Sequence, residues 1–426
     1  MSDAARHREP AATARRHHGS FIAGLGIGQI ISWGSLYYSF PLIAGPMGRD
    51  LALSMPEIYG AATVGLVVGS LATYPIGVAI DRGHGRSIMA CGSALGGLLL
   101  VAWSQIASLW TFYCLFIGIG LAQAMTLYEP ALAIVARRYG AEARTGITAL
   151  TLWGGFASTV FVPVVQLLLD HGGWREALRV LGLLNLGLCV VLHLAVIDPQ
   201  ADALEPSLSS MQGGGVPPVG QHTIRWALGQ SAFWGLLVSL TVYSGTFSGI
   251  SFHLYPLLLE RGFDAATVVG VIALIGPAQV AGRLAIWVLG RNRSVRSMGM
   301  ATVLALPLSL MLLMLLPSSF ASLAVFAVIY GAANGVMTIV RGLAVPELLT
   351  REAYGTINGA LAAPGIVARA LAPAAIALLW SAAHSYDAVL IAAVMGSTLV
   401  AVSFWFVVAV TRSKGAVINN PGKVTS

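Results

Sequence analysis

Two arginines, Arg283 and Arg369, stand inside long apolar runs and are the residues best suited to bind a ligand there. Each is the only charged residue of its run, 265–290 for Arg283 and 359–380 for Arg369. An unpaired guanidinium deep in a bilayer costs several kcal/mol, with estimates from about 2.5 kcal/mol upward. Because a planar guanidinium can hold a carboxylate through two parallel hydrogen bonds, the pair predicts a cavity that binds an organic anion.

Arg283 admits a second interpretation. It lies roughly 9 Å from the middle of its run at the rise of an α-helix. A long side chain at that depth can also extend to the nearer membrane surface. Arg369 is close to the middle of its run, and from there its side chain reaches the membrane surface less easily.

A polar and aromatic stripe in the first apolar segment is a further candidate for the site. Gln29, Trp33 and Tyr37 share one face of a helix at intervals of four residues. Aromatic walls with a few polar tips are typical of small-molecule sites, although Trp and Tyr also line membrane interfaces. We predict that this stripe lines the substrate site together with Gln279, which stands one helical turn before Arg283.

An acid and a base at similar depth could form a gate. Glu129 is the only acid well inside an apolar segment of the first half, and Arg341 lies at a comparable position in the second half. We predict that they pair across the two halves and that protonation of Glu129 weakens the pair, which would couple transport to protons. A static pair within one half, or a pair between Arg341 and Glu347, is the alternative.

The composition excludes several classes of protein. Of 426 residues, 57% are hydrophobic and 10% are charged, whereas soluble domains carry about 25% charged residues. The chain has no basic stripe, so nucleic acid is not an expected partner. Its cysteines, Cys91, Cys114 and Cys189, are scattered singly, and no phosphate loop, metal-ligand spacing or nucleophile motif is present. We therefore expect no metal, no cofactor and no enzymatic activity.

The apolar segments predict an all-α membrane protein with twelve transmembrane helices in two six-helix lobes. A span needs about 20 mostly apolar residues. The lobes are expected at 19–197 and 230–412, with a polar tail at 1–18, a linker at 198–229 and a second tail at 413–426. The candidate spans are 19–47, 57–80, 87–106, 109–136, 145–169, 176–197, 230–259, 264–289, 297–316, 320–346, 355–381 and 386–411.

The loops predict that both termini are cytoplasmic. Lys and Arg gather in every second loop, counted from the N-terminal tail, and such loops face the cytoplasm. The two halves also resemble each other: Gly155 and Pro163 match Gly365 and Pro373 at one constant offset. Parallel halves of six spans are typical of two-lobed secondary transporters, whose site lies between the lobes near the middle of the membrane.

The loop between the second and third spans reads Gly77-Val-Ala-Ile-Asp81-Arg82-Gly83-His84-Gly85-Arg86. It resembles the signature loop of the major facilitator superfamily, which usually has glycine where His84 stands. The resemblance implies a gating role for Asp81, Arg82 and Arg86, and the alternative is a plain basic inner loop. The matching loop of the second half, 290–293, has lost the acid.

A narrower likeness is to the oxalate/formate antiporters and the monocarboxylate transporters. Those families place a basic residue in span 8, as Arg283 does, and the oxalate/formate group adds one in span 11, as Arg369 does. The monocarboxylate group usually has Asp where Gln279 stands.

This likeness implies a secondary active transporter that moves a small organic anion, a mono- or dicarboxylate, by alternating access. It also implies a monomer in a bacterial inner membrane. Coupling to a proton or to a counter-substrate stays open. The alternative is an exporter of a drug, a toxic oxyanion or a metalloid, which would share the architecture and differ in the chemistry of the cavity.

Overall fold

The computed structural model describes residues 9–139, 143–199, 225–289, 294–315, 319–349 and 354–418. These residues form helices and connecting turns, with no strand among them. The chain divides into two compact units, Met1–Gln212 and Gly213–Ser426. Most of the predicted linker, 198–229, lies outside the described residues.

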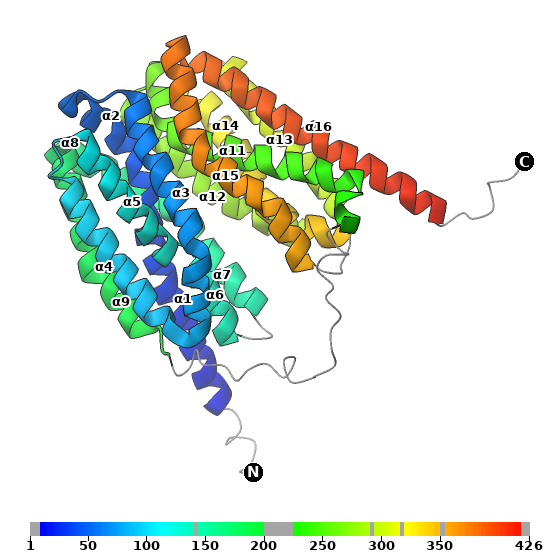
Figure 1. The fold of residues 1–426 in the computed structure, drawn as a ribbon, viewed down its shortest axis with the longest axis horizontal. Helices are drawn as coiled ribbons and strands as arrows, with labels where there is room; N and C mark the ends of the chain where they lie inside the picture. The colour runs from blue at the N-terminus through cyan, green and yellow to red at the C-terminus, as the bar shows by residue number, and fades with distance from the viewer. Residues whose placement is uncertain are drawn as a thin grey trace, which may run out of the picture. The chain divides into compact units, whose positions relative to one another are not determined.

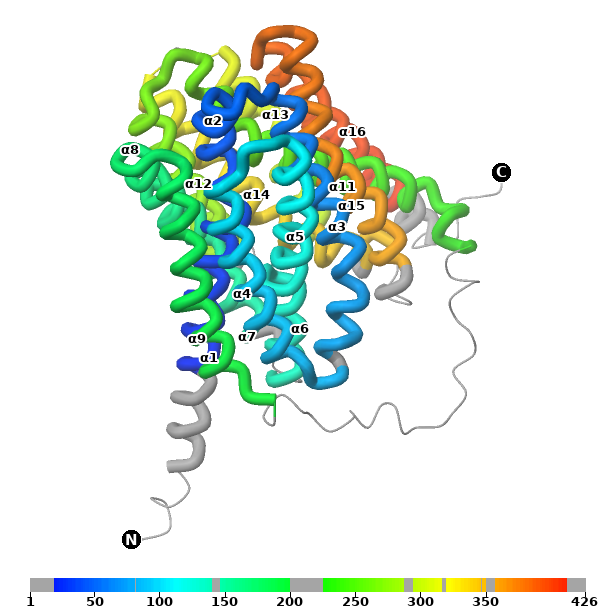
Figure 2. Tube along the Cα trace, turned by 60° about the vertical axis from the view of Figure 1, so that its left-hand side comes forward, coloured from blue at the N-terminus to red at the C-terminus, as the bar shows by residue number. Residues whose placement is uncertain are grey.

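Unit 1 is a bundle whose long helices run beside one another (Figures 1 and 2). Three π-helical turns interrupt the α-helices among its described residues. Its elements are α1 Glu9–Trp33, η1 Gly34–Tyr38, α2 Ser39–Leu51, α3 Met55–Ala79, η2 Ile80–His84, α4 Gly85–Trp103, α5 Leu109–Thr126, α6 Tyr128–Tyr139, α7 Ala143–Gly155, α8 Ala157–Leu184, η4 Asn185–Cys189 and α9 Val190–Val196.

Unit 2 has longer uninterrupted helices. These are α11 Ser231–Glu260, α12 Ala265–Leu289, α13 Val295–Leu315, α14 Phe320–Leu348, α15 Tyr354–Ala383 and α16 Tyr386–Ile418.

Ten helical segments within the described chain are long and apolar enough to cross a membrane. The count differs from the predicted twelve at two places. The predicted first span, 19–47, which falls on α1, η1 and α2, is not among the ten. The segment Gly146–Val196 contains the predicted fifth and sixth spans as one piece, with a non-helical residue, Gly173, at φ +71° inside it.

Glycine contacts hold the second and fourth long segments of each unit together. In unit 1, a Cβ on Gly120 of α5 would lie 1.9 Å from the carbonyl oxygen of Gly65 on α3. In unit 2, a Cβ on Gly331 of α14 would lie 2.7 Å from the carbonyl oxygen of Ile275 on α12. Only a residue without a side chain allows these backbones to approach so closely, as is common between membrane helices.

The fourth long segments of the two units, α5 and α14, begin alike. The Ser108 hydroxyl accepts a hydrogen bond from the Thr111 amide at the start of α5, and the Ser319 hydroxyl accepts one from the Ser322 amide at the start of α14. Such N-caps satisfy amide groups that have no partner within the helix. Caps and glycine contacts therefore extend the internal repeat read in the sequence.

An acid near the end of the first span is anchored in each unit. In unit 1, the Asp50 carboxylate bonds Arg175 and accepts the Trp174 indole N–H at 3.2 Å. In unit 2, the Glu260 carboxylate accepts the Trp380 indole N–H and the Tyr386 amide, each at 2.7 Å. The bonds connect the first span of each unit to a helix that lies more than one hundred residues further along the chain.

Candidate functional site

A buried tyrosine and a buried asparagine connect α11 and α14 inside unit 2. The Tyr243 hydroxyl donates to Asn334 Oδ1 at 2.9 Å, and Asn334 Nδ2 donates to the Tyr330 carbonyl at 2.7 Å. Tyr243 is 6% and Asn334 is 2% exposed. A buried amide keeps its place when both of its ends are bonded, as they are here.

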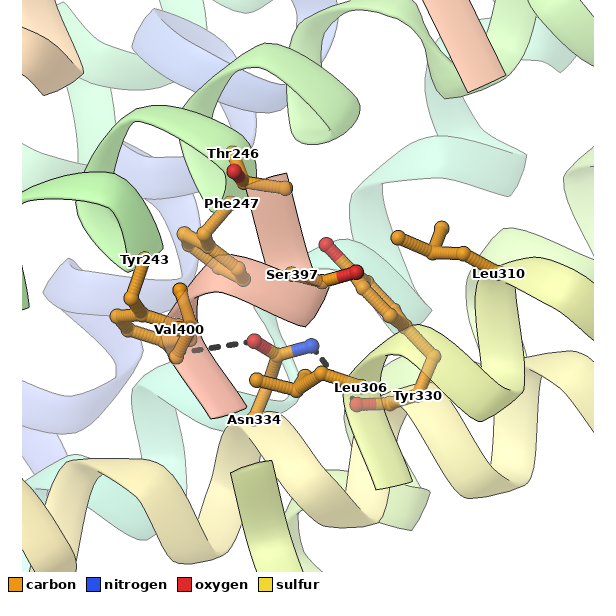
Figure 3. Close-up of a pocket in the computed structure, with 9 residues that line it drawn as sticks. All are labelled: Tyr243, Thr246, Phe247, Leu306, Leu310, Tyr330, Asn334, Ser397 and Val400. Carbon is orange, nitrogen blue, oxygen red and sulfur yellow. Dashed lines mark hydrogen bonds between the residues drawn. The ribbon is translucent and has the colours of Figure 1, made fainter. Parts of the chain in front are cut away.

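A small pocket opens beside this hydrogen-bonded pair (Figure 3). The side chains of Tyr330 and Ser397 point toward one another across it. Four helices of unit 2 supply the lining, which consists of Tyr243, Thr246 and Phe247 from α11, Leu306 and Leu310 from α13, Tyr330 and Asn334 from α14, and Ser397 and Val400 from α16.

Arg283 of α12 reaches the same part of α14. Its Nε donates to the Gly335 carbonyl at 3.4 Å, and the side chain is half-buried. A Cβ on Gly335 would lie 2.1 Å from the carbonyl oxygen of Gln279, so glycine permits the close approach. Arg283 thus bonds the residue next to Asn334, the partner of Tyr243.

Arg369 lies in α15 with an exposed side chain. In the part of the chain that the structure describes, its guanidinium makes no hydrogen bond or ion pair. Its backbone carbonyl accepts a hydrogen bond of 2.8 Å from the Ser248 hydroxyl of α11.

Glu347, considered above as a partner of Arg341, is engaged elsewhere. One of its carboxylate oxygens accepts the Val295 amide at 3.1 Å, at the first residue of α13. A carboxylate at a helix N-terminus is favoured by the helix dipole. The two side chains form no ion pair among the described residues, so the pairing of Arg341 with Glu347 is not the one that the structure shows.

In unit 1, two further tyrosines, Tyr128 and Tyr38, join the aromatic residues of the predicted stripe. The Trp33 ring lies 5.2 Å from that of Tyr37 and 5.1 Å from that of Tyr128, between ring centroids. Tyr128 begins α6, and Tyr38 completes the group with a ring 5.3 Å from that of Tyr37. These aromatic side chains form one wall within unit 1.

Gln29 lies beside a break between α5 and α6. Its Nε2 donates to the Thr126 carbonyl at 2.7 Å and to the Leu127 carbonyl at 3.4 Å. The break has a local cause, because Pro130 has no N–H to offer the Thr126 carbonyl one turn earlier. Gln29 is fully buried, and its contact with substrate stays a prediction.

The gating residues occupy different surroundings. Glu129 is exposed in the first turn of α6, and its predicted pair with Arg341 joins the two units and stays a prediction. In the signature loop, Arg82 is exposed, Arg86 is half-buried and Gly83 has φ +91°, a left-handed conformation that favours glycine. The side chain of Asp81 and the loop 290–293 lie outside the described residues.

Asn334, Ser248 and Tyr128 were not predicted as site residues. Asn334 could have been found by the argument applied to the arginines, because it is a polar residue in the middle of an apolar segment, beside Gly335. Ser248 and Tyr128 carry no comparable signal, because serine and tyrosine are frequent in membrane helices.

Comparison with known sequences decides the family. Residues 25–313, more than half of the chain, match the sequence model described as Major Facilitator Superfamily. The chain belongs to the major facilitator superfamily. It is therefore a multi-pass membrane protein of a transporter family, which is not a family of enzymes.

The curated relatives of this major facilitator protein include monocarboxylate transporters. It is 31% identical to monocarboxylate transporter 11 of Homo sapiens over 268 residues, which cover 59% of this chain and 51% of that protein. It is 29% identical to monocarboxylate transporter 13 of Rattus norvegicus over 294 residues, which cover 68% of this chain and 65% of that protein. The matches thus span about half to two thirds of the length of these relatives.

Solved structures show the same fold as this transporter. A bacterial homologue of the human lysosomal transporter Spinster, in an inward-facing and unoccupied conformation, has a TM-score of 0.69 at 14% identity and covers 93% of this chain and 97% of its own. A mutant of the nucleoside transporter NupG has a TM-score of 0.74 at 13% identity, with coverages of 92% and 99%. At these identities the likeness concerns the fold alone.

Proposed function

We propose that this major facilitator transporter moves a small organic anion, a mono- or dicarboxylate, by alternating access. The observation that carries the proposal is the exposed guanidinium of Arg369, which has no polar partner among the described residues. In a membrane helix such a group is stable only beside water, a partner or a ligand. The likeness to monocarboxylate transporters supports the same substrate class.

The acids of unit 2 support an anion as the missing partner. Each described acid is already engaged: Glu260 with Trp380, Asp264 with Thr267, Glu347 with the Val295 amide and Asp387 with Arg261. None of these carboxylates neutralises Arg341 or Arg369. A carboxylate from the substrate would supply the charge that the described acids of unit 2 leave uncompensated.

The remaining residues take roles around this core of arginines. Arg283 and Gln279 would bind the substrate beside Arg369, with Gln29, Trp33 and Tyr37 on the side of unit 1. Asp81, Arg82 and Arg86 would latch one conformation, and a pair between Glu129 and Arg341 would close the gate and respond to protonation. We place the protein in the inner membrane as a monomer with both termini in the cytoplasm.

A thermal-shift screen tests the proposal. Purified protein would be heated with formate, acetate, lactate, pyruvate, oxalate and succinate, and in parallel with cationic drugs and arsenite. A ligand of the folded state raises the melting temperature. We expect a carboxylate to raise it in wild type and to lose this effect in Arg283→Ala and in Arg369→Ala.

The matched control is Arg179→Ala, which removes an arginine that pairs with Glu176 three residues before it in unit 1. It should keep the full shift. Absence of any carboxylate shift in wild type, or a shift that survives both arginine substitutions, would refute the anion proposal. A shift by drugs or arsenite alone would favour the exporter.

A further inference from the structure

A proline in α15 removes a helix hydrogen bond at Arg369. Pro373 follows Arg369 by one turn and has no N–H, so it cannot bond the Arg369 carbonyl. The Ser248 hydroxyl donates to that carbonyl instead, at 2.8 Å. A side chain of α11 thus replaces the missing bond at the residue whose guanidinium is exposed.

Two glycines of α11 near Ser248 face α15. A Cβ on Gly249 would lie 2.3 Å from the end of the Ile376 side chain, and a Cβ on Gly245 would be in ordinary contact with Ala368 at 3.5 Å. The hydrogen bond itself shows that α11 and α15 are close enough for a serine to touch the opposite main chain. Ser248 is fully buried, so its hydroxyl is held in this contact.

A second side chain of α11 continues the contact one turn further. His253 Nε2 lies 2.9 Å from the Pro373 carbonyl, and its Nδ1 lies 3.0 Å from the Tyr386 hydroxyl. Side chains of α11 thus contact the backbone of α15 at two carbonyls, those of Arg369 and Pro373. Of the two, the bond to the Arg369 carbonyl involves the charged residue itself.

Unit 1 contains an independent instance of the same arrangement. Pro130 offers no N–H to the Thr126 carbonyl, and Gln29 donates its amide N–H there at 2.7 Å. In both units the first span supplies a polar side chain to a carbonyl that a proline has left without its helix partner. The repetition indicates that the contact serves the fold of each unit and is more than an accident of one serine.

We propose that Ser248 is a positioning residue for Arg369. By bonding the Arg369 carbonyl, Ser248 fixes the backbone from which that side chain projects and so fixes the place of the guanidinium. This inference rests on the proposed function, in which Arg369 binds the substrate. It adds that anion affinity depends on a buried hydroxyl that contacts backbone and not substrate.

Cysteine labelling of position 369 tests the proposal without a known substrate. The three native cysteines would be replaced by serine, Arg369→Cys introduced, and the rate of modification by a positively charged methanethiosulfonate reagent measured. We expect Ser248→Ala to change this rate several-fold. The same substitution should leave unchanged the rate at Ala383→Cys, an exposed reference site at the end of α15.

Pro373→Ala supplies the decisive background, because alanine restores the N–H that can bond the Arg369 carbonyl. In that background, Ser248→Ala should no longer change the rate at position 369. The matched control is Ser244→Ala, one turn earlier on α11, whose hydroxyl bonds the Leu240 carbonyl of its own helix at 2.8 Å. It should leave the rate unchanged in both backgrounds.

The outcomes separate this inference from the function on which it rests. A rate at position 369 that Ser248→Ala does not change, or changes equally with and without Pro373, would overturn the positioning role alone. If position 369 is not labelled in any background, it does not face water, and the proposed function is then refuted as well. With the native arginine in place, Ser248→Ala should also weaken the thermal shift by a carboxylate, and Ser244→Ala should not.

Discussion

Tyr243 donates a hydrogen bond to Asn334 Oδ1 at 2.9 Å, and this bond determines which donors and acceptors of the two side chains remain available to other groups. Because Asn334 Nδ2 donates to the Tyr330 carbonyl, the amide oxygen must face Tyr243. The hydroxyl proton of Tyr243 is therefore committed to Asn334. Toward any other group, the Tyr243 oxygen is available only as an acceptor.

Breaking this bond from either side should destabilise unit 2. Tyr243→Phe leaves Asn334 Oδ1 buried without a donor, which costs about 1–3 kcal/mol. Asn334→Leu should cost a similar amount, and the double variant should cost less than the sum, by about 0.5–3 kcal/mol. Thermal unfolding in detergent measures all three variants.

Ser397→Ala serves as the control in the same pocket, because the Ser397 hydroxyl bonds the Val394 carbonyl of its own helix. It should cost less than either substitution of the pair. Strict additivity of the Tyr243 and Asn334 variants would show that the two side chains are not coupled.

Alanine at Gly335 should loosen the contact between α12 and α14. Its Cβ would lie 2.1 Å from the Gln279 carbonyl oxygen, so one backbone must shift. Overpacking of this kind costs about 1–3 kcal/mol. Because the Gly335 carbonyl accepts Arg283, the substitution should also weaken carboxylate binding, as measured by the thermal shift.

Gly342→Ala is the matched control in the same helix. A Cβ there meets nothing within 4 Å, and alanine is the better helix former by about 1 kcal/mol. We expect an unchanged or higher melting temperature. Equal effects at both glycines would contradict the close contact.

Acid should weaken the anchor at Asp50. The hydrogen bond from the Arg175 guanidinium is the main reason that the pKa of Asp50 is below its ordinary value, which is about 3.9 in an unfolded chain. A lowered pKa contributes stability above the unfolded value, and this stability is lost as the pH falls through the folded value. Wild type should therefore be more stable than Asp50→Asn at neutral pH, and the difference should shrink below about pH 4.

Melting temperatures of both proteins across this pH range provide the measurement, at low salt because exposed pairs are screened. Arg179→Gln, which breaks the neighbouring Glu176 pair, serves as the control and should leave the contribution of Asp50 in place. A gap between wild type and Asp50→Asn that is constant with pH would exclude the ionised carboxylate as its source.

Gln29 should matter only while Pro130 is present. Gln29→Leu leaves the Thr126 carbonyl without a donor, a loss of about 1–3 kcal/mol. Pro130→Ala restores an N–H at that position, so Gln29→Leu should then cost little. The melting temperatures of the two single variants and the double variant test this expectation, and an equal cost of Gln29→Leu in both backgrounds would contradict it.

Much of the architecture could be predicted from local properties of the chain. Apolar length identified the membrane helices, the signature loop indicated the superfamily, and matching prolines and glycines revealed the repeat. Arg283 and Arg369 stood out because a charge in an apolar run is costly wherever that run folds. These are properties of short segments, and a segment carries them before any contact forms.

The tertiary structure decided which residues of different segments contact one another. The sequence places Gln29 on a stripe with Trp33, but only the fold brings it against Thr126, next to the break caused by Pro130. Glu347 was the alternative partner of Arg341, and folding engaged it with the Val295 amide instead. The partner of a polar side chain depends on which distant backbone group has no other partner and lies within hydrogen-bonding distance. Hydropathy and spacing are local properties, and they do not predict the distance between residues that are far apart in the chain.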